Sequence, residues 1–121
     1  MLERVQDAPT HALALRASGS ILAREIEAAI EDALGQSDAA TGLVIVVDPD
    51  FAGYFAELAR GLANAALAHK SLVKLAVVTD AERMDEVKLS GFDISPVPVR
   101  LFASADRKAA LDWAAAARRG E

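Results

Sequence analysis

Two aspartates that each follow a short run of apolar residues are the side chains best placed for chemistry. Asp48 and Asp80 end these runs, and Asp50 is close by in sequence. If the runs are neighbouring parallel strands, both carboxylates emerge at one edge of a sheet, where α/β proteins usually bind ligands. Three such carboxylates could hold Mg²⁺. The alternative, which we expect for Asp50 and Asp80, is that strand-end aspartates cap the following helices.

An aromatic cluster follows the first of these aspartates. Phe51, Tyr54 and Phe55 crowd the start of a predicted helix in a chain with only 5% aromatic residues. An intervening glycine lowers helix propensity there and eases local opening. The cluster could therefore act as a lid over an apolar pocket or touch a membrane. The alternative is that the rings fill the core beside Phe102 and Trp113.

The remaining polar candidates form no catalytic motif. Arg100 lies within the last predicted strand, where it could pair with Asp48 or Asp80, or meet an anionic headgroup if it reaches the sheet edge. His11 and His69 are too far apart in sequence to make a metal motif. The sequence contains no G-x-S-x-G, G-x-G-x-x-G or Walker pattern. We therefore expect no catalytic residues, no metal and no cofactor.

The elements that must position these residues alternate between strands and helices. This alternation predicts an α/β domain with right-handed parallel crossovers, preceded by an antiparallel hairpin that turns near Pro9. Residues 90–96 are predicted to be irregular. The expected strands cover 2–6, 12–17, 43–47, 75–78 and 98–103, and the expected helices cover 22–34, 51–69, 81–89 and 105–118.

Length and composition restrict the class of protein. The 121 residues fit a single domain spanning 1–121, with 53% hydrophobic residues to form a core. The net charge of −5 argues against nucleic acid as a partner, because phosphate contacts need clustered Lys and Arg. There is no cysteine, no signal-peptide pattern and no apolar run of membrane-spanning length. We expect a soluble cytoplasmic protein.

Four stretches carry a resemblance to a known family. They are LRASGSI at 15–21, DFAGY at 50–54, KLAVVTD at 74–80 and VRLFASADRKAALDW at 99–113. Their joint order resembles the SpoIIAA-like proteins, small bacterial relatives of the STAS domains. The resemblance implies a mixed sheet of four to five strands with helices largely on one face. It implies no established chemistry, and members have been discussed as binders of small apolar or lipid-like ligands and as possible membrane-associated proteins.

The resemblance also raises a phosphoswitch. Anti-sigma-factor antagonists, which resemble this fold, carry a phosphorylatable serine at the start of the helix after the third strand. The corresponding segment here, residues 48–54, contains no Ser or Thr. We therefore do not expect the switch in this chain.

The leading hypothesis is a non-catalytic binding module for a small apolar or lipid-like ligand, with at most peripheral membrane association. The alternative is a regulatory protein–protein interaction module of the antagonist type that lacks the serine. A homodimer is compatible with the small side chains at 60–68. The candidate ligand-binding residues are Asp48, Asp50, Phe51, Tyr54, Phe55, Asp80 and Arg100.

Overall fold

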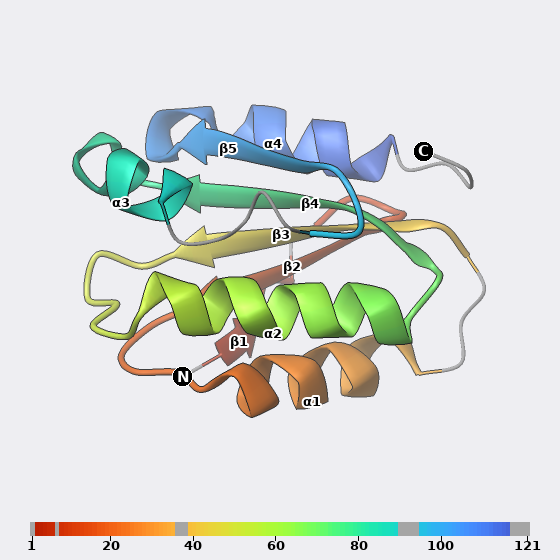
Figure 1. Ribbon diagram of the computed structural model, residues 1–121. Coiled ribbons are helices and arrows are strands. Elements are labelled where there is room, and N and C mark those ends of the chain that lie inside the picture. Colours follow the sequence, from red (N-terminus) through yellow and green to blue (C-terminus); the bar gives the residue numbers. More distant parts are fainter. Residues whose placement is uncertain (1, 7, 36–38, 90–94, 117–121) are drawn as a thin grey trace.

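A five-stranded mixed sheet forms the centre of the protein in the computed structural model, which describes residues 2–6, 8–35, 39–89 and 95–116 (Figure 1). The strands follow one another across the sheet in sequence order. The first pair is antiparallel, and every later pair is parallel. The strands are β1 (Leu2–Arg4), β2 (Ala12–Ala17), β3 (Thr41–Val47), β4 (Leu72–Thr79) and β5 (Val99–Ala103).

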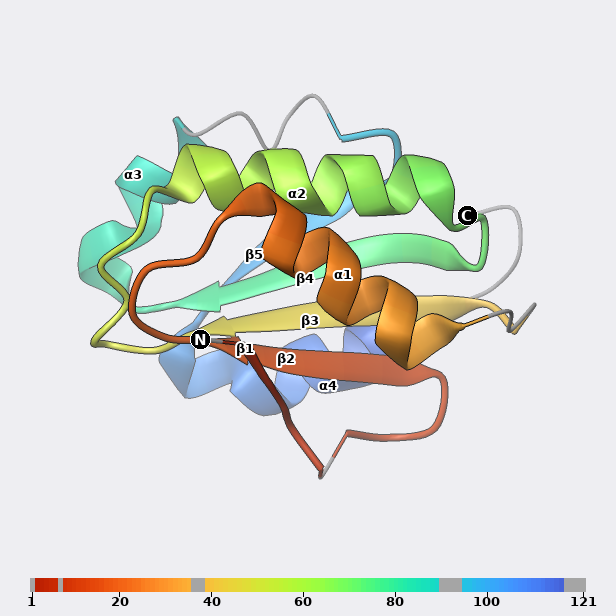
Figure 2. The same cartoon turned by 90° about the horizontal axis from the view of Figure 1, so that it is seen from below.

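Helices cover both faces of this sheet. The two longest helices lie side by side on one face, and the last helix covers the opposite face (Figures 1 and 2). Val87 of the short third helix packs in the same apolar layer as the two longest helices, so the helices lie largely on one face, as the family resemblance implies, and the last helix lies on the other. The helices are α1 (Ala23–Leu34), α2 (Phe55–Ala68), α3 (Met84–Lys88) and α4 (Arg107–Ala115), with 3₁₀ turns at Ala81–Arg83 and Ser104–Asp106.

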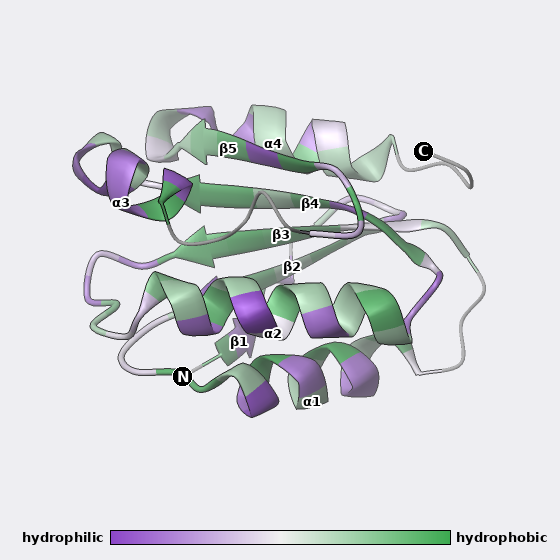
Figure 3. Ribbon diagram, in the orientation of Figure 1, coloured by the Kyte–Doolittle hydropathy of each residue, from purple (hydrophilic) through white to green (hydrophobic). Residues whose placement is uncertain are grey.

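The two sheet faces pack into two separate apolar layers. Ile45 and Val77 point toward α1 and α2, whereas Val44 and Ala76 point toward α4, as expected from the alternation of side chains along a strand. All eight residues of β4 are buried. Figure 3 shows the result as hydrophobic central strands between helices that carry hydrophilic stripes. The continuous apolar runs in the sequence arise from this two-sided burial.

Two glycines allow the layers to approach closely. A Cβ atom on Gly42 would overlap the carbonyl oxygen of Ala114, so β3 and the end of α4 meet backbone to backbone. A Cβ on Gly61 would lie 2.8 Å from the carbonyl oxygen of Ala23, so α1 and α2 also pack closely. The two glycines therefore allow α4 to pack closely on the sheet and α1 to pack closely on α2.

The structure confirms the predicted order of elements and the opening hairpin, with one shift that matters for the site. The helix predicted over 51–69 begins at Phe55, so residues 48–54 form a loop. Most of the irregular segment predicted at 90–96 lies outside the described residues. No helix in the described ranges has both the length and the apolar character needed to cross a membrane. The cytoplasmic location stays a prediction.

Candidate functional site

The ends of β3 and β4 bring two of the predicted site residues to one edge of the sheet. The strands are parallel neighbours, with Val46 in register with Val78. Asp48 and Asp80 follow these strands directly, which confirms that both carboxylates emerge at the same edge. Both have local structural partners, described next.

Asp48 holds the start of the loop that follows β3. Its Oδ1 accepts a hydrogen bond from the backbone N–H of Asp50 at 3.1 Å, and its Oδ2 lies 2.7 Å from Nε of Arg16. The hydrogen bond from Asp50 is the largest cause that lowers the pKa of Asp48, and the Arg16 guanidinium acts in the same direction, while desolvation opposes them. Asp48 is thus held as a carboxylate that shapes the turn.

Asp80 caps the 3₁₀ turn that precedes α3. Its Oδ1 accepts from the backbone N–H of Arg83 at 3.0 Å, which confirms the predicted capping role. The Arg83 guanidinium then reaches back and donates to the carbonyl oxygen of Pro49 at 2.9 Å. The same prediction for Asp50 was wrong, because α2 begins after Tyr54 and has no side-chain cap.

The aromatic cluster separates into two buried rings and one exposed ring. Phe51 and Phe55 are each 4% exposed, and their ring centroids are 5.2 Å apart within the layer under α1 and α2. Phe102 and Trp113 pack on the opposite face of the sheet, so the prediction that they adjoin the cluster was wrong. Tyr54 is 79% exposed. The geometry places the two phenylalanines in the core, and the lid stays a prediction.

The loop at 48–54 is tied to the loop that precedes α1. The carbonyl oxygen of Gly19 accepts from the backbone N–H groups of Ala52 and Gly53, at 2.8 and 3.2 Å. Four residues after Gly19 and four after Gly53, in the first turns of α1 and α2, the backbone N–H of Ala23 donates to Oε2 of Glu57 at 2.8 Å. The starts of α1 and α2 are therefore joined by backbone and side-chain hydrogen bonds.

This junction brings forward two residues that the sequence analysis did not select. Leu22 directly precedes α1 and is 44% exposed, in the position that Tyr54 occupies before α2. Arg16 is the arginine that pairs with Asp48. The alternation along β2 indicates which sheet face Arg16 shares with Ala14. The pairing with Asp48 depends in addition on the register between β2 and β3, which the sequence does not give. We call residues 19–22 and 50–54 the loop edge.

Arg100 lies away from the loop edge. It is in register with Ala76, four residues before Asp80, which corresponds to about 13 Å along the strand. Its guanidinium carbon lies 5.0 Å from the ring centroid of Phe102. The expected pairing with Asp48 or Asp80 is thus replaced by a cation–π contact within the edge strand.

Acidic side chains surround the loop edge. Asp50 is exposed, and the neighbouring 3₁₀ turn and α3 add exposed Glu82, Asp85 and Glu86, whereas Arg83 is held by its bond to the loop. In Figure 1, α3 and the loop after β3 lie at the same end of the molecule. Among the described residues, no group of three or more His, Asp or Glu side chains is placed to hold a metal ion. This end of the sheet thus carries the exposed carboxylates of Asp50, Glu82 and Asp85, together with the exposed basic side chains of Arg24 and Lys88.

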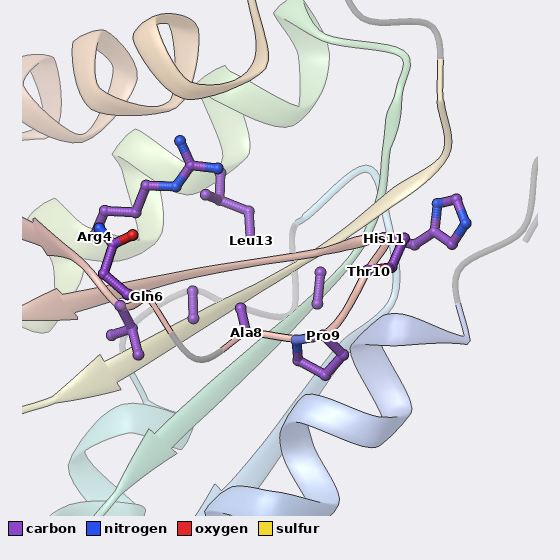
Figure 4. A pocket seen from close by; sticks show the side chains of 10 residues that line it. Arg4, Gln6, Ala8, Pro9, Thr10, His11 and Leu13 are labelled. Carbon is purple, nitrogen blue, oxygen red and sulfur yellow. The ribbon is translucent and has the colours of Figure 1, made fainter.

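Two cavities lie at the other end of the strands, around the β1–β2 hairpin, and a third lies along the first turns of α4. The first, of about 330 Å³, is lined by residues 4–6 and 8–14 (Figure 4). The second, of about 190 Å³, extends from the same hairpin to the end of α1. The third, of about 470 Å³, lies between Pro9 and α4. None of the predicted ligand-binding residues lines these three cavities.

Comparison with known proteins identifies the family. The chain matches the SpoIIAA-like family over residues 12–115. No curated protein matches it. It is similar to the crystal structure of an uncharacterized protein from the DUF3478 family with a SpoIIAA-like fold from Shewanella loihica PV-4, with 21% identity and a TM-score of 0.60 over 94% of this chain and 90% of that chain. This likeness shows the fold, and the family match extends over most of the sequence. The chain belongs to the SpoIIAA-like family.

Proposed function

We propose that the protein is a non-catalytic module that binds a partner protein through the loop edge. The observation that carries this proposal is the exposure of Tyr54, at 79%, next to a segment that also exposes Leu22, at 44%. Tyrosine is enriched at protein interfaces, because its large ring buries apolar area while its hydroxyl keeps a hydrogen-bond partner. Two large exposed side chains on joined segments are a suitable centre for such a contact.

The fixed conformation of the loop edge supports this use. Gly19 holds Ala52 and Gly53, Asp48 holds Asp50, and Arg83 holds Pro49. A surface that is already ordered loses little conformational entropy when a partner binds. Tyr54 is therefore presented on a preorganised backbone.

The charges around the loop edge favour a basic partner. Asp50, Glu82 and Asp85 are exposed close to this end of the sheet against two exposed basic residues, Arg24 and Lys88, and the chain carries a net charge of −5. An anionic membrane would be repelled by such a surface, whereas a protein that surrounds an apolar patch with Lys or Arg would be attracted. Charge complementarity thus supports protein binding over membrane association.

A small apolar ligand at the same edge has less support. Phe51 and Phe55 are packed into the core, and none of the three cavities is lined by a residue of the loop edge. In open α/β sheets, ligands enter the crevice where the strand order reverses. Here β2, β3, β4 and β5 follow one another without a reversal, so the fold does not open a crevice at this edge.

The proposal can be tested with a photo-crosslinking amino acid at two positions of α2 and its cap. Position 54 lies on the loop edge, and position 67 is a matched control, because Leu67 is 70% exposed near the other end of α2. The tagged protein would be irradiated in its native host. We expect a discrete crosslinked protein from position 54 and not from position 67, and we expect Leu22→Ser to reduce its yield.

The mass of the product identifies the partner. A product with twice the chain mass would make a second copy the partner, as the predicted homodimer requires, and a different mass would indicate a heterologous partner. Equal products from positions 54 and 67, or a yield that Leu22→Ser leaves unchanged, would contradict docking at the loop edge.

A further inference from the structure

The strand β5 is one of the two outer strands of the sheet, and among the described strands only β4 pairs with it (Figure 1). The N–H of Leu75 donates to the carbonyl oxygen of Pro98 at 2.9 Å, which fixes the phase of the parallel ladder. Such a ladder uses alternate residues of each strand, so the backbone groups of Val99 and Leu101 point away from β4. These groups are the donors and acceptors with which a further strand would pair.

The side chains of β5 differ between the two faces of the sheet. Val99 and Leu101 are half-buried against the apolar layer under α1 and α2. Arg100 is exposed on the opposite face, where its guanidinium carbon lies 5.0 Å from the ring centroid of Phe102. The outer strand therefore carries apolar side chains on one face and a cation beside an aromatic ring on the other.

The sequence of β5 is complementary to itself. When all of β5 pairs antiparallel with a second copy about a two-fold axis normal to the sheet, Leu101 lies opposite Leu101. The same register sets Val99 opposite Ala103, and Arg100 opposite Phe102. Apolar pairs and cation–aromatic pairs both stabilise neighbouring strands. The outward backbone groups of Val99 and Leu101 fall in the hydrogen-bonded pairs of this register.

The other outer strand, β1, does not share this property. Pairing all of β1 with a second copy in the same way would set the exposed Glu3 opposite Glu3. The bond from the N–H of Val5 to the carbonyl oxygen of Ala14 places Glu3 in a hydrogen-bonded pair with β2. On its outer side Glu3 would then form a non-hydrogen-bonded pair, in which side chains approach most closely. Like charges directly opposite destabilise a strand pair, so charge favours β5 over β1 as the strand that meets a second copy.

We infer that the protein forms a two-fold dimer in which the β5 strands of two copies pair antiparallel and join the two sheets into one. The pairing uses no residue of the loop edge, so it is independent of the proposed protein docking. One short strand from each copy makes a small contact, for which we expect a dissociation constant of about 10 µM to 1 mM. The competing explanation is that Arg100 protects the outer strand from pairing, as charged residues do on many outer strands.

The absence of cysteine from the sequence allows a crosslinking test that depends on the register. Leu101→Cys would place two thiols at the two-fold axis with Cα atoms about 5.5 Å apart, within the range of a disulfide. Val99→Cys is the matched control, because Val99 is also half-buried on the same face, whereas its two copies would lie about 13 Å apart along the strands. Mild oxidation of the full chain should give a covalent dimer for Leu101→Cys and not for Val99→Cys. Adding Ala103→Cys to the control should restore the covalent dimer.

Sedimentation equilibrium separates a contact made by Arg100 from protection of the outer strand. Arg100→Ala should raise the dissociation constant of the dimer about fivefold, because two cation–aromatic contacts are lost. Protection of the outer strand predicts the opposite, a tighter dimer for the variant. Arg24→Ala is the control, because this exposed arginine lies on α1, next to β1, and it should leave the dissociation constant unchanged.

Three outcomes would overturn the inference. These are a wild-type chain that stays monomeric at about 1 mM, equal crosslinking of Leu101→Cys and Val99→Cys, and a tighter dimer for Arg100→Ala. The first measurement needs no variant, so it does not depend on how a substitution affects folding. A photo-crosslinked partner at position 54 without a dimer would remove the β5 pairing and leave docking at the loop edge in place.

Discussion

Replacing Phe51 by alanine separates a core role from a lid role. The Phe51 ring is 4% exposed and packs 5.2 Å from the ring of Phe55. Burial of such a ring contributes about 1.5–3 kcal/mol. The void left by truncation raises the expected loss in the free energy of unfolding to about 3–5 kcal/mol. For a chain of 121 residues, total stability is roughly 6–18 kcal/mol, so the loss is a large part of it.

Urea denaturation would measure this loss. The single tryptophan, Trp113, lies on the opposite face of the sheet, so its fluorescence reports unfolding without contacting the mutated site. With a urea dependence near 2 kcal/mol/M, the unfolding midpoint of Phe51→Ala should fall by roughly 2 M. Tyr54→Ala is the matched control, because Tyr54 is exposed, and its stability should change by less than about 0.5 kcal/mol.

A small loss of stability in Phe51→Ala would refute the core role of Phe51. If Phe51→Ala lost under about 1 kcal/mol with an unchanged urea dependence, Phe51 would not belong to the core. If the same variant also lost binding to an apolar probe, the ring would act as a lid, and the small-ligand hypothesis would replace protein docking.

Two further predictions test the close packing and the fixed carboxylate. Gly42→Ala should destabilise the protein by more than about 2 kcal/mol, because the new methyl group would overlap the Ala114 carbonyl; a circular-dichroism melting curve equal to that of wild type would contradict this. Asp48→Asn should lower the urea midpoint at neutral pH. The native pKa of Asp48 is below that of the unfolded chain, so its contribution is complete above the unfolded value of about 3.9 and declines as the pH falls through the native value. The gap between wild type and variant should therefore shrink in acid, and a gap that stays constant would count against the effect.

Much of the fold follows from periodicity in the sequence. The apolar runs that became β3 and β4 are buried on both faces, and the stripe of Ile26 and Ile30 marks the inner side of α1. The position of α4 was harder to predict, because its small residues do not show which sheet face they cover. Its contact with β3 depends on Gly42, which is about 70 residues away in sequence.

The candidate site was only partly predictable, because its geometry depends on strand register and on contacts between distant loops. Neighbouring apolar strands were enough to predict that Asp48 and Asp80 share an edge. The start of α2 could not be predicted, because the loop at 48–54 is held by Gly19, more than 30 residues earlier in the chain. The register also decides that Arg16 reaches Asp48 and that Arg100 does not reach the edge.

The hydrogen bond from Ala23 to Glu57 makes the starts of two helices interdependent. Neither Leu22 nor Tyr54 caps its helix with its own side chain, and at the start of α1 Glu25 accepts from the N–H of Leu22 at 3.4 Å. The N–H of Ala23, the first residue of α1, is satisfied by a carboxylate from the first turn of α2. Fraying of α2 would remove that acceptor and so weaken the first turn of α1. The two crossover helices thus form a cooperative pair. A partner protein that binds one helix also stabilises the start of the other against fraying.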